Sequence, residues 1–553
     1  MKSEKLYPSD LTYHQEKFQA SQLVIPLFAT HSEAKKAFFR QTRKGESWQL
    51  DFQNHQIYIA IQRIEKSVTL TNLLFVKGQP SWTKVLQALE NFLRQQFVED
   101  VLIPVNFGEA MSTWLLQQGY HQTTKGMQKQ FVYHRGLVLG GGGAKGAYQI
   151  GVWQALKSEN ITFEVITGTS VGALNGALVL LDDVEVARDL WLTISTDKVL
   201  AYPDASKDSQ SLKELLQQIN SLATTAIREN GASTEPLQKL LRNLYNQEKM
   251  SQYPAKFFLC TTRFPTMQET VHEFDVSQGV SELDWLIGSA SFYPAMMPKQ
   301  IGEYHYVDGG YRNNIPIDVA IAQGVTECIC IDVKGPGITK KVEIPEHVAI
   351  TNFRTPWTLG NLLVFDRERS ELNYRLGYLE TMKTLGHFKG YWYTFSQGTN
   401  WRKDWRGFLQ SLQEEPLYLA LIQQTDFWKK IAKIYLQKAP VEEGGLILME
   451  LIGRVLEITP SHVYTQETFL EALQNAYQAE QPAMVGSLSV GEWLQQLHNQ
   501  RFVLSEKNQL IRLYQTMQEK GEIPPQVLTL VPIVAVAAKF LSYLAENEEE
   551  QTI

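Results

Sequence analysis

The stretch GLVLGGGGAKG, residues 136–146, carries the strongest structural signal in the sequence, because an apolar run ends in four glycines and leads into the helical pattern AYQIGVWQAL. Free backbone N–H groups at such a strand-to-helix turn can bind an anion or a developing oxyanion. Further short apolar runs stand at residues 165–170, 257–262, 327–333 and 347–353. Such runs are typical of buried strands in a parallel sheet. The sequence therefore predicts an α/β fold with a mainly parallel sheet.

A serine occupies a second predicted strand-to-helix turn. The apolar strand EVITGTS ends in GTSVG, residues 168–172, and the helical pattern ALNGALVLL follows. A serine between small residues at such a turn is typical of a nucleophile elbow, in which the glycines let chain and substrate approach without a Cβ clash. The pattern predicts Ser170 as a nucleophile.

An aspartate follows a third predicted strand, EYHYV, in the sequence VDGG at residues 307–310. Taken alone, this motif is also compatible with a simple turn. The 138 positions from Ser170 to Asp308 allow the chain to return to a neighbouring strand of the same sheet. Because a desolvated carboxylate can accept the proton of a serine hydroxyl, Asp308 is the predicted base.

Together these motifs resemble the patatin-like phospholipase family. The Gly-Gly-Gly-x-Lys-Gly loop at residues 141–146, the serine turn at 168–172 and the Asp-Gly-Gly at 308–310 occur in the family's order. The stretch SASFYPAMMP, residues 289–298, also looks like the family's Ala-Ser-x-x-x-Pro stretch. The resemblance covers residues 134–396, and it implies a three-layer core with a mainly parallel sheet.

The same resemblance implies a serine acyl hydrolase of the phospholipase or lysophospholipase type. Such an enzyme cleaves a lipid ester or phospholipid with a Ser-Asp dyad through an acyl-enzyme, and it needs no metal or other cofactor. Carried over to this sequence, Ser170 is the nucleophile and Asp308 is its base. The implied oxyanion hole consists of backbone N–H groups at Gly141, Gly142 and Gly143.

Several alternatives remain open at this stage. Lys145 orients the glycine loop, contacts a substrate phosphate, or is simply a solvated lysine. A Ser-His-Asp triad would use His305 or His272, the nearest histidine candidates. An acyltransferase would share the first half-reaction, and a catalytically silent scaffold would bind lipid or a partner protein.

A dinucleotide-binding oxidoreductase is the alternative from a different class. Gly141, Gly143 and Gly146 match the Gly-x-Gly-x-x-Gly fingerprint. This interpretation leaves Ser170 unexplained. It also places the required acidic residue at Glu164, only four positions before the serine turn rather than at the end of a separate strand.

Residues 1–133 are predicted to form an α+β domain. From residue 23 onward, strand and helix patterns alternate, and their order and the phrase LLQQGY resemble the second half of a Gcn5-related N-acetyltransferase domain. That family binds the pyrophosphate of acetyl-CoA on a glycine-containing turn. Here the turn reads VKGQPSWTKV, in which Gly78 stands alone and Pro80 removes a backbone donor. We therefore expect a degenerate, non-catalytic acetyltransferase-like domain.

Residues 397–553 show Leu, Gln and Glu at helical spacing and predict an all-α region. The stretch Val527–Ala538 lacks charge but is shorter than the roughly 20 residues that span a membrane. Pro532 and Lys539 also interrupt it. It predicts a core helix, with contact at a membrane surface as the alternative.

The composition, with 44% hydrophobic and 20% charged residues, indicates a multidomain globular protein and excludes disordered classes. Three cysteines, two of them Cys328 and Cys330 in CICIDV, predict buried reduced thiols rather than disulfides or a zinc site. The net charge of −7 argues against nucleic-acid binding, although residues 1–133 carry 15 Lys and Arg against 11 Asp and Glu. Residues 1–18 show no secretory signal. We expect a cytoplasmic protein that contacts the inner face of the membrane peripherally; its protein partners are unknown.

Overall fold

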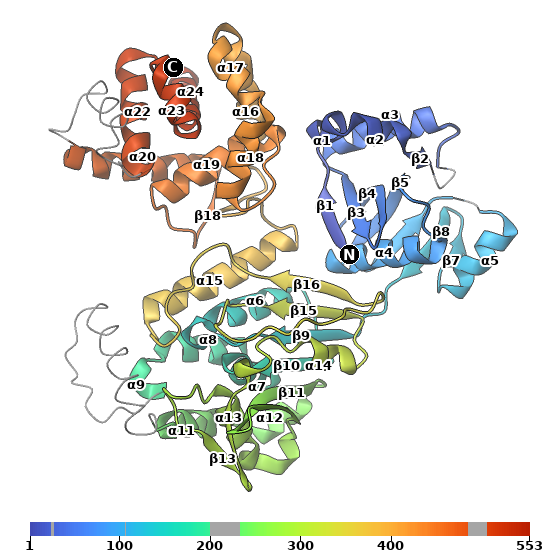
Figure 1. Ribbon diagram of the computed structural model, residues 1–553, viewed down its shortest axis with the longest axis vertical. Coiled ribbons are helices and arrows are strands. Elements are labelled where there is room, and N and C mark those ends of the chain that lie inside the picture. Colours follow the sequence, from blue (N-terminus) through green and yellow to red (C-terminus); the bar gives the residue numbers. More distant parts are fainter. Residues whose placement is uncertain (24–26, 106, 200–232, 485–505, 553) are drawn as a thin grey trace. The chain divides into compact units, whose positions relative to one another are not determined.

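The computed structural model describes residues 1–23, 27–105, 107–199, 233–484 and 506–552 (Figure 1). The chain divides into two compact units. The first unit contains Met1–Lys5, Ala20–Gln41 and Glu46–Leu385. The second unit contains Leu6–Gln19, Thr42–Gly45 and Gly386–Ile553. The domain boundaries expected after residues 133 and 396 remain predictions.

A mainly parallel sheet forms the core of the region after residue 134. Its strands are β9 (Arg135–Leu139), β10 (Val165–Thr169), β11 (Lys256–Phe264), β12 (Gln268–Glu273), β13 (Lys299–Ile301), β14 (Tyr304–Asp308), β15 (Glu327–Ile331) and β16 (Ala349–Phe353). Their order is β13-β14-β11-β10-β9-β15-β16, and β12 also pairs with β11. The five strands from β11 to β16 in this order are parallel, whereas β12, β13 and β14 pair antiparallel.

Helices cover both faces of this sheet (Figure 1). Leu137 and Leu139 join the apolar cluster that contains Trp153, whereas Val138 between them joins the cluster that contains Val319. Successive strand residues point to opposite faces, so the sheet is buried on both sides and the predicted α/β class is confirmed. The helices are α6 (Ala147–Ser158), α7 (Val171–Leu180), α8 (Val184–Thr193), α9 (Thr196–Val199), α11 (Glu235–Leu244), α12 (Gln247–Gln252), α13 (Leu283–Ala290), α14 (Ile317–Ala322) and α15 (Arg367–Thr384).

A second, mixed sheet forms in the N-terminal part of the first unit. Its strands are β1 (Lys2–Lys5), β2 (Gln22–Leu23), β3 (Ser47–Phe52), β4 (His55–Ile64), β5 (Ser67–Lys77), β6 (Asp100–Ile103), β7 (His121–Thr123) and β8 (Gly126–Gln130). The order is β1-β3-β4-β5-β6-β8-β7, with β2 on β5 and with β5 and β6 parallel. Its helices are α3 (His31–Lys44), α4 (Trp82–Gln95) and α5 (Glu109–Gln117). The predicted alternation of strands and helices is confirmed, and the acetyltransferase assignment remains a prediction.

Helices make up most of the second unit. They are α1 (Pro8–Tyr13), α2 (Gln15–Ala20), α16 (Trp401–Ser411), α17 (Pro416–Ile422), α18 (Thr425–Tyr435), α19 (Gly444–Val455), α20 (Gln466–Met484), α22 (Glu506–Lys520), α23 (Pro525–Leu530) and α24 (Pro532–Thr552). The prediction of an all-α region is wrong in one detail, because β17 (Thr394–Phe395) and β18 (Val463–Tyr464) form a short parallel pair. Helix α1 belongs to this unit: the backbone N–H and side-chain hydroxyl of Ser9 each donate to Glu442 at 2.8 Å.

The uncharged stretch Val527–Ala538 contributes to the core of the second unit. Val527, Val536 and Ala538 are fully buried, and Pro532 begins α24. The predicted burial is therefore confirmed, but the stretch is divided between α23 and α24 at Pro532 and is not a single helix. Its buried residues cannot serve as a membrane contact. None of the helices that the structure describes is both long enough and apolar enough to cross a membrane.

Candidate active site

Ser170 lies at the tight turn between β10 and α7. Its backbone angles are φ 56° and ψ −125°, in a region that non-glycine residues rarely adopt. Both flanking glycines are required by close backbone contacts. A Cβ at Gly168 would lie 2.4 Å from the carbonyl oxygen of Gly172, and a Cβ at Gly172 would lie 2.0 Å from that of Leu139. The strand, turn and helix expected around Ser170 are therefore present.

Ser289, on α13, holds this turn in place. Its side-chain oxygen accepts the backbone N–H of Ser170 at 2.9 Å, and its hydroxyl donates to the carbonyl oxygen of Cys260 at 2.7 Å. The Ser170 turn is thereby tied to the neighbouring strand β11. Sequence reasoning missed this role; its only signal was the position of Ser289 at the start of the 289–298 stretch.

The sheet brings Asp308 to Ser170 through their shared neighbour β11. Thr169, the last residue of β10, pairs with Cys260, whereas Asp308, the last residue of β14, pairs with Thr261. Because β12 occupies the opposite edge of β11 over these residues, β10 and β14 lie end to end along one edge. The expectation that the two strands are direct neighbours is therefore wrong, but their ends meet.

The Asp308 carboxylate is almost completely buried, with 5% of the residue exposed. One oxygen accepts the backbone N–H of Gly310 at 2.7 Å, and the side chain of Ser170 lies beside the carboxylate at the same cavity. Burial raises the pKa of Asp308 to about 6, although the nearby Ser170 side chain and the Gly310 N–H favour the charged form and oppose this shift. The carboxylate is thus ionised at neutral pH and is basic enough to accept a proton there.

The glycine loop presents two backbone N–H groups beside Ser170. Gly142 and Gly143 line the same cavity as Ser170, and their N–H groups meet no acceptor within the described part of the chain. The prediction that Gly141 also contributes a donor to the oxyanion hole is wrong, because its N–H donates to the carbonyl oxygen of Asn314 at 3.0 Å. Gly142 and Gly143 are therefore the loop donors placed to bind an oxyanion.

A buried amide network fixes both ends of this loop. The side chain of Gln149 donates to the carbonyl oxygen of Gly140 at 2.7 Å. Asn175, on α7, donates to the carbonyl oxygen of Gly146 at 3.0 Å and to the Gln149 side chain at 2.7 Å. Because α7 begins directly after Ser170, the network couples the loop to the serine turn. No local pattern in the sequence indicates a role for either amide.

Lys145 is not among the residues that line the cavity. Its ammonium group donates to the carbonyl oxygen of Lys334 at 3.0 Å. Burial lowers its pKa, an effect that the nearby Asp332 opposes. This contact matches the role of orienting the glycine loop, and the roles of substrate contact and of a merely solvated lysine remain predictions.

Neither histidine considered as a base reaches the site. His305 is exposed on β14. The imidazole of His272 lies 2.7 Å from the Glu282 carboxylate and stacks on Trp285, with ring centroids 4.1 Å apart. Among the residues that the structure describes, no histidine lines the cavity beside Ser170.

The acidic residue that dinucleotide binding would require also lies at the wrong end of the sheet relative to the glycine loop. Glu164 precedes β10 and accepts the backbone N–H of Arg135 at 2.6 Å. Arg135 is the first residue of β9, so Glu164 lies at the end of these parallel strands opposite to Ser170 and the glycine loop. The dinucleotide interpretation is therefore contradicted by the position of its own acid.

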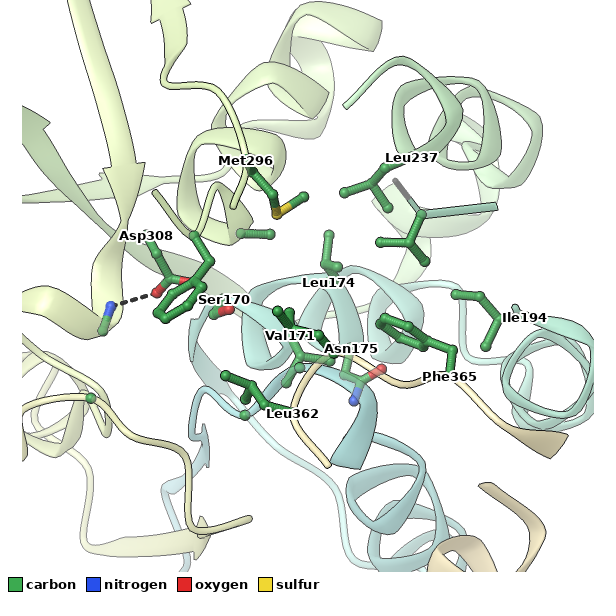
Figure 2. Close-up of a pocket in the computed structure, with 18 of the residues that line it drawn as sticks. Ser170, Val171, Leu174, Asn175, Ile194, Leu237, Met296, Asp308, Leu362 and Phe365 are labelled. Carbon is green, nitrogen blue, oxygen red and sulfur yellow. Dashed lines mark hydrogen bonds between the residues drawn. The ribbon is translucent and has the colours of Figure 1, made fainter. Parts of the chain in front are cut away.

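A cavity of about 170 Å³ opens beside Ser170. Figure 2 shows Ser170 and Asp308 on one side, Leu237 and Ile194 on the other, and Leu174 between them. Apart from the residues of the glycine loop and the two side chains of Ser170 and Asp308, the lining is mostly aliphatic and aromatic. A serine hydroxyl, a buried carboxylate and two N–H donors thus meet at an apolar cavity. Further lining residues include Val171, Leu178, Trp191, Leu241, Phe292, Met296, Leu362 and Phe365.

The fold and this arrangement coincide with a match to a known family. The family model described as "Patatin-like phospholipase" matches residues 137–321. This part of the chain therefore matches a patatin-like phospholipase domain. The match includes Ser170, Asp308 and the glycine loop.

Curated relatives match at low identity. A patatin-like phospholipase domain-containing protein of Caenorhabditis elegans is 25% identical over 258 residues, covering 45% of this chain and 17% of that protein. Patatin-like phospholipase domain-containing protein 7 of Rattus norvegicus is 27% identical over 206 residues, covering 36% and 13%. Lysophospholipase NTE1 of Saccharomyces cerevisiae is 23% identical over 266 residues, covering 45% and 14%. This chain spans less than a fifth of the length of these relatives.

One solved structure is also similar. The crystal structure of VipD from Legionella pneumophila aligns with 77% of this chain and 93% of its own, at 14% identity and a TM-score of 0.29. A TM-score this low supports no conclusion about a shared overall fold.

Proposed function

We propose that this protein is a serine acyl hydrolase of lipid carboxylic esters, of the phospholipase or lysophospholipase type. One observation carries the proposal: Ser170 and the buried carboxylate of Asp308 lie together at one side of a mostly apolar cavity. An apolar cavity suits an acyl chain, and the paired side chains suit attack on the ester at its end. The names of the relatives, a patatin-like phospholipase and a lysophospholipase, support the same substrate class.

In the first half-reaction, Asp308 accepts the hydroxyl proton of Ser170 while the serine oxygen attacks the ester carbonyl carbon. The N–H groups of Gly142 and Gly143 bind the negative charge that develops on the carbonyl oxygen. The tetrahedral intermediate then collapses, the bond to the leaving alcohol breaks, and the alcohol takes the proton from Asp308. An acyl-enzyme on Ser170 remains.

In the second half-reaction, water replaces the alcohol. Asp308 accepts a proton from this water as the water oxygen attacks the acyl carbonyl, and the same two N–H groups bind the oxyanion. Collapse of the intermediate releases a fatty acid, and the proton on Asp308 returns to the serine oxygen. The proposed cycle uses no metal or other cofactor.

For the remainder of the chain we propose the sequence-based boundaries. Residues 1–133 would form a non-catalytic acetyltransferase-like domain, 134–396 the hydrolase domain and 397–553 a helical region. Because a lipid substrate is insoluble in water, we also propose peripheral contact with a membrane, at its cytoplasmic face.

Labelling with a fluorophosphonate probe tests the proposed nucleophile. Intact-protein mass spectrometry should detect one adduct on the wild type and none on Ser170→Ala. Ser170→Ala should also lower the hydrolysis of a short-chain chromogenic ester on the order of a thousand-fold, because no covalent route remains. The matched control is Ser281→Ala, an exposed serine outside the cavity, which should keep both properties. A folded Ser170→Ala protein with more than about a tenth of the activity would contradict the proposal.

A further inference from the structure

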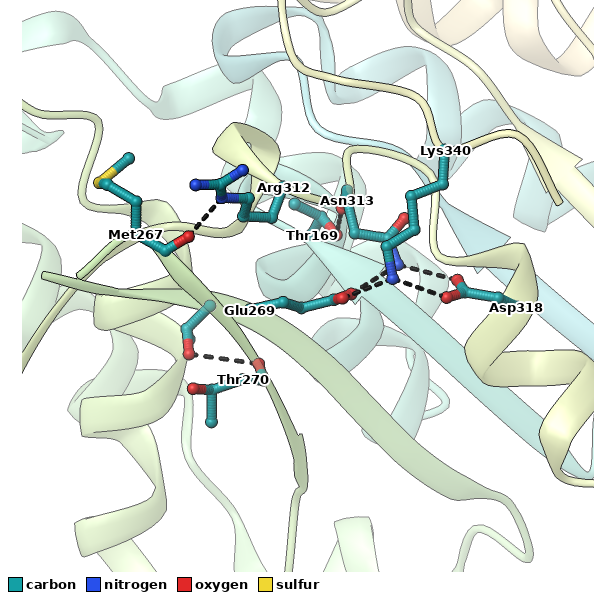
Figure 3. Close-up of polar contacts among 9 residues, drawn as sticks. Thr169, Met267, Glu269, Thr270, Arg312, Asn313, Asp318 and Lys340 are labelled. Carbon is teal, nitrogen blue, oxygen red and sulfur yellow. Dashed lines mark hydrogen bonds and ion pairs between the residues drawn. The ribbon is translucent and has the colours of Figure 1, made fainter.

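Figure 3 shows a closed ring of polar side chains that includes Asn313, five residues after Asp308 in the chain. Asn313 is fully buried and donates its side-chain N–H groups to Glu269 and to Asp318, at 2.8 Å each. Lys340 donates to the same two carboxylates, at 2.8 Å to Asp318 and at close range to Glu269. The four side chains come from β12, α14, the Asp308 turn and the segment that follows β15.

Asn313 connects this ring to the two turns that carry the reacting side chains. Its backbone N–H donates to the carbonyl oxygen of Gly309 at 2.9 Å, within the turn that begins at Asp308. Its backbone carbonyl accepts the hydroxyl of Thr169 at 2.7 Å. Because Thr169 directly precedes Ser170, a shift of Asn313 would change the position of the Asp308 turn relative to the serine turn.

Residues 336–340, here called the strap, pair with the same turn. The N–H of Ile338 donates to the carbonyl oxygen of Gly310, and the N–H of Asn314 donates to that of Ile338, each at 2.8 Å. Pro336, Gly337 and Ile338 line the cavity beside Asp308. Lys340 is the last residue of the strap, so its contacts with the ring anchor this wall of the cavity.

The ring requires its cation. Two carboxylates that share one amide repel each other, and without Lys340 their charges would lack a partner in a partly buried place. Burial lowers the pKa of Lys340, but its hydrogen bonds to Asp318 and Glu269 outweigh burial and raise the pKa overall. The lysine is therefore charged at neutral pH.

We propose that Lys340 is a positioning residue of this active site. By holding Glu269 and Asp318 together, it fixes Asn313 and the strap, and thereby the placement of Asp308 against Ser170. Lys340 does not line the cavity, so it acts through other residues and not on the substrate. The catalytic part of this inference rests on the proposed hydrolase function, whereas the anchoring part does not.

Hydrogen–deuterium exchange tests the anchoring without any substrate. In Lys340→Met, the amides of Asn313, Asn314 and Ile338 should exchange at least about tenfold faster, because the turn and the strap open more often. Lys341→Met is the matched control: Lys341 is exposed and adjacent in sequence, and its loss should leave these amides unchanged. Unchanged exchange in Lys340→Met, or equal acceleration in both variants, would overturn the anchoring role.

Steady-state kinetics on a soluble ester tests the catalytic consequence. Lys340→Met should lower kcat about tenfold or more with little change in KM, because small displacements of reacting groups mainly affect the chemical step. Lys340→Arg keeps the cation and should restore most of kcat. A kcat that stays unchanged while exchange accelerates, or a loss that Arg does not restore, would overturn the positioning role. A wild type that neither reacts with the fluorophosphonate nor hydrolyses esters would instead refute the proposed function, and the exchange result would still decide the anchoring.

Discussion

Acidification should inactivate the protein by protonating Asp308. With a pKa of about 6, about nine-tenths of the Asp308 side chains are ionised at pH 7 and about one-tenth at pH 5. Only the ionised form can accept the serine proton, so kcat/KM should fall about tenfold between these pH values. It should fall about another tenfold for each further pH unit.

Protonation of Asp308 does not destabilise the folded protein, so unfolding driven by this residue would not explain the loss of activity at acid pH. Burial raises the pKa of Asp308 from its ordinary value of 3.8 to about 6, so the folded protein binds this proton more tightly than the unfolded chain. The contribution of Asp308 to stability is therefore fully present below pH 3.8 and is lost as the pH rises through 6. At this residue, acidification from pH 7 to pH 5 stabilises the fold.

The assay is the initial rate with a chromogenic ester below KM, from pH 4.5 to 8, with samples made alkaline before the absorbance is read. Because a histidine base would titrate in a similar range, His272→Ala and His305→Ala are the controls, and both should keep the acid limb. Asp308→Asn should abolish turnover without unfolding the protein. A flat profile between pH 5 and 7, or a limb that disappears in His272→Ala, would refute Asp308 as the base.

Two further predictions concern the other parts of the protein. Residues 1–133, within the full chain, should bind acetyl-CoA weakly or not at all, because Pro80 lacks an N–H. The cavity between α4, α5 and the sheet also measures only about 10 Å³, which is room for about one water molecule. A low-micromolar dissociation constant in a calorimetric titration would contradict this prediction. The protein should float modestly with anionic liposomes, because its net charge of −7 does not attract it to anionic lipid and local apolar surface must contribute. Salt should release part of it, because residues 1–133, with 15 Lys and Arg against 11 Asp and Glu, add a local attraction that salt screens. Release only by detergent, or full activity on soluble esters without any flotation, would contradict peripheral contact.

Hydrophobic runs and glycine turns in the sequence predicted the strands and turns that carry the active site. The apolar runs at residues 136–139 and 165–169 are strands in the structure, and the glycines around Ser170 are where backbone carbonyls leave no space for a Cβ. Hydrophobic runs and glycine turns report local requirements, so a single sequence can show them. The place of Asp308 at a strand end was visible for the same reason.

Partners distant in the chain were not predictable in this way. The backbone N–H of Gly141 donates to a carbonyl oxygen about 170 residues further along the chain. The ammonium group of Lys145 donates to one about 190 residues further along. Nothing near either residue indicates such a partner. Ser289 and Asn175 likewise gain their roles only from what the fold brings against them.

By itself, the sequence determined the α/β class, the serine turn and the carboxylate at a strand end, because periodicity and backbone crowding act over a few residues. The tertiary structure alone decided that β10 and β14 meet end to end on β11, which brings Ser170 and Asp308 together. It also decided that the carboxylate is buried deeply enough to raise its pKa. Strand order and burial depend on contacts between segments more than a hundred residues apart, and no local pattern encodes those contacts.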